Sequence, residues 1–219
     1  MPMDLFPLWL SLRVALTATA LTLVIGIPVA LLLARRRFPG KNVLEAAVVL
    51  PLVLPPTVLG YYLLLVIGSR GPVGRALAAL GLELAFTWGA AVLAACVGSI
   101  ALVIKSAQAG FEGVDRQLEQ AARTLGRSEW SVFWSVTLPL AWRAVLAGGV
   151  LAFCRALGEF GITLMVAGNI PGRTQTLPLA IYDRVQGAQM GEANALALIA
   201  VAVVVVLLFG LSRVARLRY

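Results

Sequence analysis

Two ionisable residues, Arg155 and Glu159, lie within a long apolar stretch of the sequence. Their spacing of four residues places both side chains on one face of a helix, close enough to pair. A charged group in apolar surroundings is costly unless it is paired or faces a polar interior. Two roles fit: Arg155 attracts an anion in transit while Glu159 neutralises it at rest, or the two form a structural pair that fixes helix packing or a dimer. We favour the structural pair, because tight binding would oppose the release of a passing anion.

The other residue types exclude most enzymatic chemistry. The 219-residue sequence contains no histidine, which excludes Ser-His-Asp and Cys-His catalysis and every imidazole metal site. No convincing pair of carboxylates or metal-ligating cluster stands out, so no catalytic, cofactor or metal site is predicted. Cys96 and Cys154 each fall inside an apolar run and are expected to be packing residues, not a disulfide.

The chain also lacks the motif that would let it hydrolyse ATP. A P-loop requires G-x-x-x-x-G-K-[ST], in which backbone N–H groups and the lysine hold the phosphates. Neither lysine fits, because Lys41 precedes Asn42 and Lys105 follows Ile104. Any ATP-driven process would therefore need a partner subunit.

The composition requires a lipid environment. The sequence is 60% apolar and 13% charged, with a mean hydropathy of +0.92, whereas a soluble domain carries about 25% charged residues. The charges cluster between apolar runs that are long enough to cross a hydrocarbon core of roughly 30 Å. The net charge of +8 is therefore interpreted as a signal of membrane topology and not as a nucleic-acid-binding surface.

Five apolar runs predict an all-α, multi-pass membrane helix bundle, with the whole chain (1–219) as a single domain. Each run is continuous and lacks the polar–apolar alternation of a barrel strand. A sixth short or re-entrant segment within about 177–189 stays open. The runs cover about Trp9–Ala34, Val43–Gly68, Ala85–Lys105, Ala144–Ala167 and Ala195–Leu211.

The positions of Lys and Arg predict the orientation, because positive residues are enriched in cytoplasmic loops. Most lie after the first span, between the third and fourth, and after the fifth, and five spans place these three regions on one side. We therefore predict an outside N-terminus and a cytoplasmic C-terminus. The predicted cytoplasmic residues are Arg35, Arg36, Arg37, Lys41, Lys105, Arg116, Arg123, Arg127, Arg143, Arg213, Arg216 and Arg218, whereas Arg13, Arg70, Arg75, Arg173 and Arg184 fall on the other side.

Three prolines interrupt the second span. Pro51, Pro55 and Pro56 each remove a helical N–H and collide with the preceding turn. The freed carbonyls must be satisfied by neighbouring helices or water, so this span is expected to be kinked or broken and buried in protein. The break, with Thr57 after it, is a candidate for lining a path through the membrane. A kink that serves only packing is the alternative.

The polar connection 106–142 is predicted to hold two short helices. Ala121 and Ala122 lie in the first, Gly126 would end it in a left-handed conformation, and Ser128 would cap the second. Small residues permit close approach and aromatic residues anchor interfaces, so the connection is predicted to be a docking surface. The alternative is that its aromatic residues lie at the membrane interface. Those aromatic residues are Trp130, Phe133 and Trp134.

This connection resembles the EAA loop of bacterial ABC importer permeases. The family pattern is E-A-A, three residues, Gly, nine residues, a β-branched or apolar residue, any residue, and Leu-Pro. The spacing matches, with Gln120 in place of the first Glu and Glu119 one step earlier. The resemblance implies that 106–142 is a cytoplasmic coupling loop seated in a groove of a separate ATPase. The coupling residues it implies are Glu119, Gln120, Ala121, Ala122, Gly126, Leu138 and Pro139.

Three further segments look like the molybdate and sulfate branch of that family. They are Pro51–Gly60, Arg155–Gly161 and Asn169–Pro178, and the last is more similar to the molybdate permeases. The resemblance implies a type I ABC importer transmembrane-domain fold in a bacterial inner membrane. It also implies a homodimer that works with two ABC ATPase subunits and an extracytoplasmic oxyanion-binding protein, with molybdate as the expected substrate. Pro55, Pro56, Thr57, Arg155 and Glu159 are the candidates for the translocation path or a structural pair.

Other readings fit the sequence less well. An ion-driven secondary transporter often shows internal repeats, but none is found, and five spans cannot divide into equal halves. An intramembrane enzyme would need the catalytic residues that are missing. Sulfate, thiosulfate and tungstate stay open as substrates, because tetrahedral dianions of similar size can be selected by the binding protein alone.

Overall fold

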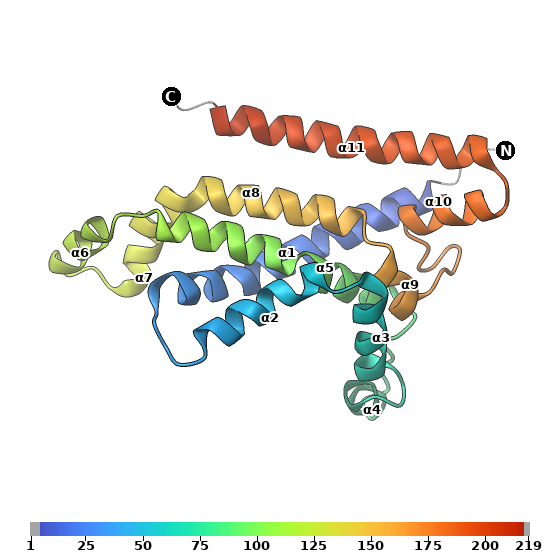
Figure 1. Cartoon of the computed structure of the whole chain (residues 1–219), viewed down its shortest axis with the longest axis horizontal. Coiled ribbons are helices and arrows are strands. Elements are labelled where there is room, and N and C mark those ends of the chain that lie inside the picture. Colours follow the sequence, from blue (N-terminus) through green and yellow to red (C-terminus); the bar gives the residue numbers. More distant parts are fainter. Residues whose placement is uncertain (1–4, 217–219) are drawn as a thin grey trace.

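The computed structural model describes residues 5–216, and every regular element in that part of the chain is helical (Figure 1). Within it, four helices are long and apolar enough to cross a membrane, and one bent pair makes a fifth candidate span. The predicted all-α bundle of about five spans is confirmed. The elements are α1 (Phe6–Arg35), α2 (Lys41–Val53), α3 (Pro56–Ile67), α4 (Pro72–Ala78), α5 (Trp88–Glu112), α6 (Arg116–Thr124), α7 (Glu129–Val132), the π-helical turn η1 (Phe133–Thr137), α8 (Leu138–Leu157), α9 (Gly161–Ala167), α10 (Leu177–Gln186) and α11 (Met190–Arg216).

Helix α5 forms the centre of the bundle, between α1 and α8. Its neighbours approach closely, because small residues replace large ones where the backbones meet. A methyl group added at Gly148 of α8 would lie 2.8 Å from Cβ of Ser106, and one added at Gly110 of α5 would lie 2.5 Å from Cβ of Ala144. The buried small residues of α5 include Ala90, Ala91, Ala94, Ala95, Gly98, Ala101 and Ala107.

The first and fifth predicted spans are confirmed as α1 and α11. Polar side chains inside α1 find partners within the helix, since the hydroxyls of Thr17 and Thr19 donate to the carbonyl oxygens of Arg13 (2.8 Å) and Ala15 (2.7 Å). Helix α11 runs along the outside of the bundle (Figure 1), and only 11% of its most apolar window is buried. Its remaining surface is left for lipid or another chain.

The second predicted span is broken, as its prolines indicate. Helices α2 and α3 differ in direction by 113°, so α3 leaves the bundle sideways (Figure 1). Pro51 lies inside α2, whereas Pro56 occupies the first turn of α3, where a missing N–H costs little. The expected burial of the break is not reached within one chain. Pro55 and Pro56 are exposed, because α3 packs only one face against α9.

The fourth predicted span, Ala144–Ala167, is wrong at both ends. Residues Glu129–Leu157 form one long helix through α7, η1 and α8, so the expected separate second helix of the connection is its first turns. Pro139 lies in the first turn of α8. Proline has no backbone N–H to donate to the preceding turn, and that turn is π-helical instead of α-helical. The helix ends at Leu157, residues 158–160 are not helical, and α9 then runs in another direction (Figure 1).

Helix α5 also runs beyond its predicted end at Lys105, to Glu112. Gln108 in this extension has hydrogen-bond partners, since its side-chain amide donates to Glu45 of α2 (3.3 Å) and to Glu112 (2.9 Å). The possible sixth segment is α10, whose 10 residues are too few to cross a core of roughly 30 Å.

The predicted cytoplasmic regions gather at one end of the bundle. The end of α1, helix α6 and the last turns of α11 lie at this end, and α1 begins at the opposite end (Figure 1). Arg218 lies outside the described residues. The predicted basic regions therefore lie at the same end of the bundle. That this end faces the cytoplasm stays a prediction.

Candidate functional site

The first candidate site is the turn between α6 and α7, residues 115–134, called here the α6–α7 corner. Its ends are set locally: the carboxylate of Asp115 accepts from the backbone N–H of Gln117 (2.8 Å) and begins α6. Gly126 adopts the left-handed conformation with a φ of +79°, and the Ser128 hydroxyl accepts from the N–H of Ser131 (3.3 Å) to begin α7. The predicted stop at Gly126 and cap at Ser128 are confirmed.

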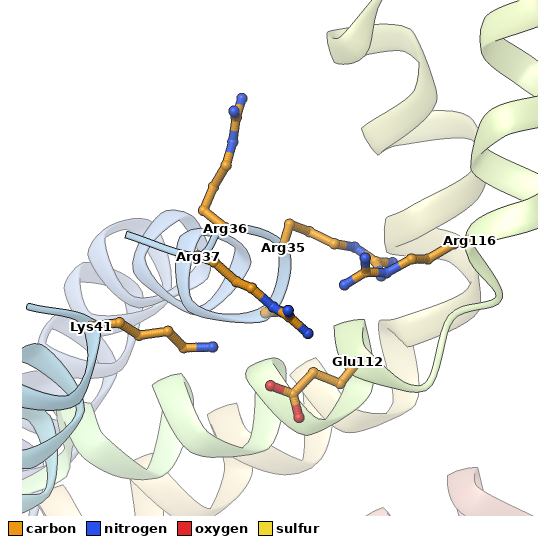
Figure 2. A pocket seen from close by; sticks show the side chains of 7 residues that line it. Arg35, Arg36, Arg37, Lys41, Glu112 and Arg116 are labelled. Atoms are coloured by element: carbon orange, nitrogen blue, oxygen red, sulfur yellow. The ribbon is translucent and has the colours of Figure 1, made fainter. Parts of the chain in front are cut away.

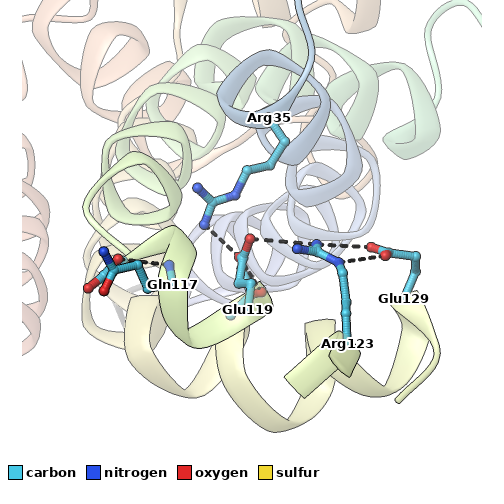
Figure 3. A network of polar contacts seen from close by, with 7 residues as sticks. Arg35, Gln117, Glu119, Arg123 and Glu129 are labelled. Carbon is cyan, nitrogen blue, oxygen red and sulfur yellow. Dashed lines mark hydrogen bonds and ion pairs between the residues drawn. The ribbon is translucent and has the colours of Figure 1, made fainter. Parts of the chain in front are cut away.

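Glu119 fixes α6 to the bundle (Figure 3). Its side chain is only 5% exposed. One carboxylate oxygen accepts from Nη2 of Arg35 at the end of α1 (2.6 Å) and from the Thr137 hydroxyl in η1 (2.7 Å). The other oxygen lies 3.7 Å from Arg123. Glu119 therefore faces the chain's own helices and not a partner, although it stands beside the first position of the EAA pattern.

The opposite face of α6 points into solvent. Ala121 is exposed at its centre, with Leu118 three residues before it and Leu125 four residues after it. These spacings place all three on one helical face, and the two leucines are 51% and 84% exposed. Trp130 of α7 is 71% exposed as well. The corner thus presents apolar side chains around a small residue, which is the chemistry of a docking surface.

The other predicted coupling residues surround this face or support it from behind. Gln120 and Gly126 are exposed and Ala122 is half-buried. Behind them, Leu138 packs against the core cluster formed by α1, α5 and α8, and Pro139 is exposed. Gln120, Ala122 and Gly126 belong to the corner, and Leu138 and Pro139 follow it in the chain. Ala121 is the predicted coupling residue that lies between the exposed Leu118 and Leu125.

Arg123 links the two helices of the corner. Its guanidinium donates to both carboxylate oxygens of Glu129, at 2.7 and 3.1 Å (Figure 3). This hydrogen-bonded pair raises the pKa of Arg123, which therefore stays charged. Because Glu129 begins the long helix that contains α8, a displacement of α6 would be passed to that helix.

The second candidate site is the Arg155–Glu159 pair, which the structure brings together at the end of α8. Nη1 of Arg155 lies 2.6 Å from Oε2 of Glu159, whose side chain is 2% exposed. The other carboxylate oxygen accepts from the backbone N–H of Ile162 (2.9 Å) in the first turn of α9. A methyl group added at Gly98 of α5 would lie 2.9 Å from Oε2. Glu159 thus pairs with Arg155, caps α9 and packs against α5.

The proline break and this pair are neighbours in space. A methyl group added at Gly161 would lie 2.7 Å from Cβ of Pro56, and one added at Gly60 would lie 2.7 Å from Cβ of Met165. The break between α2 and α3 is therefore seated on α9 at Gly161, one residue before Ile162, whose N–H is accepted by Glu159. Two sequence segments more than a hundred residues apart form one unit, in which Thr57 is exposed.

The roles of five residues in these sites were not predicted from the sequence. In the sequence, Arg35 gives only a topology signal, and Thr137 fills the position of the EAA pattern that accepts any residue. Gly98 lies in an otherwise unremarkable run of small residues. The apolar spacing of Leu118 and Leu125 was the one signal that could have shown the outward face.

Known proteins support this description of the chain. The family model for the binding-protein-dependent transport system inner membrane component matches residues 26–217. The chain belongs to this family. Its relatives include the molybdenum transport system permease protein ModB of Escherichia coli K12, which is 46% identical over 95% of this chain and 93% of the relative. The putative molybdenum transport system permease YvgM of Bacillus subtilis is 44% identical over 80% of this chain and 78% of the relative.

A more distant relative carries a different substrate in its name. The probable sulfate transport system permease of Chlorokybus atmophyticus is 35% identical over 92% of this chain and 71% of the relative. Family membership and the apolar helices make the chain a multi-pass subunit of an inner-membrane transport system.

Solved structures share the fold at low sequence identity. An inward-facing MetNI methionine ABC transporter superposes with a TM-score of 0.74 at 18% identity, over 98% of this chain and 95% of that chain. A bacterial alginate ABC importer gives a TM-score of 0.70 at 17% identity, over 98% and 81%. The fold is that of a type I ABC importer transmembrane domain.

Proposed function

We propose that this chain is the permease subunit of an ATP-driven importer for molybdate. The observation that carries this proposal is the 46% identity, over 95% of the chain, to a permease named for molybdenum transport. The sulfate permease is less similar, at 35%, which makes sulfate and thiosulfate the weaker candidates. Tungstate has the same charge and shape as molybdate and is expected to be carried as well.

In this proposal, the segment 106–142 holds the coupling loop, whose α6–α7 corner enters a groove of a separate ATPase subunit, while its two ends continue into α5 and α8. The exposed Leu118, Ala121 and Leu125 support this role, because they present a small centre with apolar sides beyond the end of the bundle. Gln120, Ala122 and Gly126 would line the edge of the contact. ATP hydrolysis belongs to the partner, since neither lysine of this chain fits a P-loop.

Two polar links would carry motion from the corner into the membrane. The Glu119–Arg35 contact ties α6 to α1, and the Arg123–Glu129 contact ties α6 to the long helix of α7, η1 and α8. Because both α1 and α8 pack along α5, a push on α6 is expected to move the bundle as one body. Rigid-body rocking of two such bundles would alternate access across the membrane.

A second copy of the chain completes the proposed permease. The break between α2 and α3 is exposed in one chain, with Val53 74% exposed and Thr57 open, although prolines in a membrane need protein or water around them. A homodimer would cover this surface and place the breaks of both copies along the oxyanion path. An extracytoplasmic binding protein would deliver the oxyanion to the outer end.

The Arg155–Glu159 pair serves structure in this proposal and does not bind the oxyanion. Glu159 already engages Arg155 and the N–H of Ile162 and is 2% exposed, so the charge of Arg155 is compensated beside α5. The pair would hold the break between α8 and α9, on which the proline break of the path is seated.

The proposal is tested with the assembled permease–ATPase complex in lipid vesicles, together with its binding protein. ATP hydrolysis is measured with binding protein loaded with molybdate, tungstate or sulfate. Stimulation by molybdate and tungstate, with none by sulfate, is the expected result. Equal stimulation by sulfate would contradict the substrate assignment. Oxyanion uptake by this chain alone, without ATP, would contradict the ABC mechanism and favour an ion-driven transporter.

A further inference from the structure

A basic pocket lies where α1, α2, α5 and α6 meet (Figure 2). Its volume is about 250 Å³, and its lining holds five basic side chains and a single carboxylate. It is separate from the exposed face of the α6–α7 corner and from the proline break. The lining residues are Ala34, Arg35, Arg36, Arg37, Lys41, Glu112 and Arg116.

Four of the basic side chains converge on this pocket from different elements. In Figure 2, Arg35, Arg37, Lys41 and Arg116 extend toward a common space, while Arg36 points away from it. Among the described residues, no ion pair is observed for Arg37 or Arg116, and the Nε atom of Arg35 is buried without a hydrogen-bond partner.

The acidic groups nearby neutralise only part of this positive charge. Glu112 accepts a hydrogen bond from the amide of Gln108 (2.9 Å). Glu45 forms an ion pair with Lys41 at 3.7 Å. The Glu119 carboxylate accepts hydrogen bonds from Arg35 and Thr137. The pocket therefore keeps an excess of positive charge.

A preference for positive residues at the cytoplasmic end explains why such residues occur here, but not why they converge. Like charges repel one another, yet the exposed Arg37 and Arg116 extend toward the pocket, whereas Arg36 points away from it. Converging guanidinium groups with free N–H donors form a site for a multivalent oxyanion, since guanidinium matches the geometry of phosphate.

We propose that this pocket binds the phosphate group of an acidic phospholipid from the membrane leaflet at the α6 end. The pocket borders surface that suits acyl chains, because Leu32 near the end of α1 is 42% exposed and Val43 in the first turn of α2 is 72% exposed. A phospholipid combines an anionic head with apolar chains, and basic pockets between membrane helices bind such heads. Free inorganic phosphate or the transported oxyanion would use the head site alone.

The position of the pocket gives the bound lipid a role in coupling. Arg116 is the first residue of α6, and Arg35 holds Glu119 of the same helix. A phosphate between them would neutralise the repulsion behind α6 and stabilise its seat on α1. This role rests on the proposed function of the α6–α7 corner, whereas lipid binding itself does not depend on transport.

The test measures lipid bound to the purified permease–ATPase complex by native mass spectrometry, with phosphatidylglycerol or phosphatidylcholine added. The variant Arg37→Gln/Arg116→Gln is compared with Arg70→Gln/Arg75→Gln, which removes the same charge at two exposed residues outside the pocket, one in the loop before α4 and one in α4. Each basic residue near an anionic surface contributes about fivefold in affinity, so the pocket variant should bind phosphatidylglycerol about thirtyfold more weakly. The control variant should bind it like the parent protein.

Equal phosphatidylglycerol binding by the two variants would overturn the proposal, as would equal binding of phosphatidylcholine and phosphatidylglycerol by the parent. Inorganic phosphate and molybdate are added in a separate arm. Displacement of the lipid by either would assign the pocket to a soluble anion and overturn the lipid source, whereas retention supports it. The single variant Arg37→Gln, in the loop after α1, provides the same comparison, with a loss of about fivefold, if the double variant does not assemble. ATP hydrolysis measured in parallel separates a failure of this proposal from a failure of the proposed transport function.

Discussion

At the scale of single residues, the buried ion pairs of this chain lie where helices end. Glu119 and Arg35 join the start of α6 to the end of α1, and Glu159 and Arg155 join the start of α9 to the end of α8. Both carboxylate side chains are almost fully buried, at 5% and 2% exposed. Removing one partner of such a pair leaves a charge with little water around it, so each pair fixes a geometry more than it adds net stability.

The substitution Glu119→Gln tests the first pair. It leaves the Arg35 charge unpaired in a site where that side chain is 15% exposed, and we expect the free energy of unfolding to fall by about 3 kcal/mol. The measurement is unfolding of the purified complex by titration with a denaturing detergent. An exposed glutamine outside the corner provides the control, since Gln189→Ala should leave the transition unchanged. Equal stability of Glu119→Gln and the parent would show that the contact does not hold α6.

The substitution Glu159→Gln separates the two roles considered for the second pair. A structural role predicts lower stability and less assembled complex, because Arg155 loses its partner. Uptake per assembled complex should keep the same half-saturating oxyanion concentration. Uptake measured at several oxyanion concentrations, normalised to complex in the membrane, checks this. A changed half-saturating concentration in a fully stable complex would instead place the pair on the oxyanion path.

At the scale of elements, α6 is a short helix with two different faces. Glu119 anchors its inner face, and Ala121 lies at the centre of its outer face between Leu118 and Leu125. The substitution Ala121→Trp adds bulk where close approach is proposed, and we expect the ATPase subunit to be lost when the permease is purified. Ala76→Trp makes the same change at an exposed alanine of α4 and should retain the subunit. Retention by both variants would exclude the outer face of α6 as the contact.

The packing of α8 on α5 leads to a second prediction at this scale. A Cβ at Gly148 would lie 2.8 Å from Cβ of Ser106 and 3.3 Å from the carbonyl oxygen of Leu102, so the backbones must separate. Gly148→Ala is therefore expected to cost about 1–3 kcal/mol of stability, as overpacking typically does. Gly210→Ala in α11 meets nothing within 4 Å and should be neutral or slightly stabilising. Detergent-induced unfolding of both variants provides the comparison.

At the scale of the whole molecule, the sequence predicts what depends on continuous apolar runs and misses what depends on distant partners. α1 and α11 are uninterrupted runs, so their existence was predictable, as was the proline break of the second span. The extension of α5 to Glu112 depends on Gln108 reaching Glu45 on another helix. The break after Leu157 depends on a carboxylate capping the next helix. Neither contact leaves a periodic signal in the chain.

The candidate sites divide in the same way. The limits of the α6–α7 corner follow from local residues, with Gly126 at its left-handed turn and Ser128 as a cap, and both were predictable from residue type and spacing. The inward direction of Glu119 depends on Arg35, which is 84 residues away. Likewise, Pro56 packs against Gly161, and no local sequence pattern predicts that these two distant segments are neighbours.

The proposed homodimer leads to a prediction about which exposed surface faces the second copy. Thr57 at the proline break and Val206 on α11 are both exposed in one chain, but prolines and freed carbonyls need water or protein, whereas a continuous apolar helix can face lipid. In a background with Cys96 and Cys154 replaced by alanine, Thr57→Cys should react with a water-soluble maleimide and cross-link to its copy. Val206→Cys should do neither. Cross-linking at residue 206 without cross-linking at 57 would move the subunit interface to α11 and remove the break from the oxyanion path.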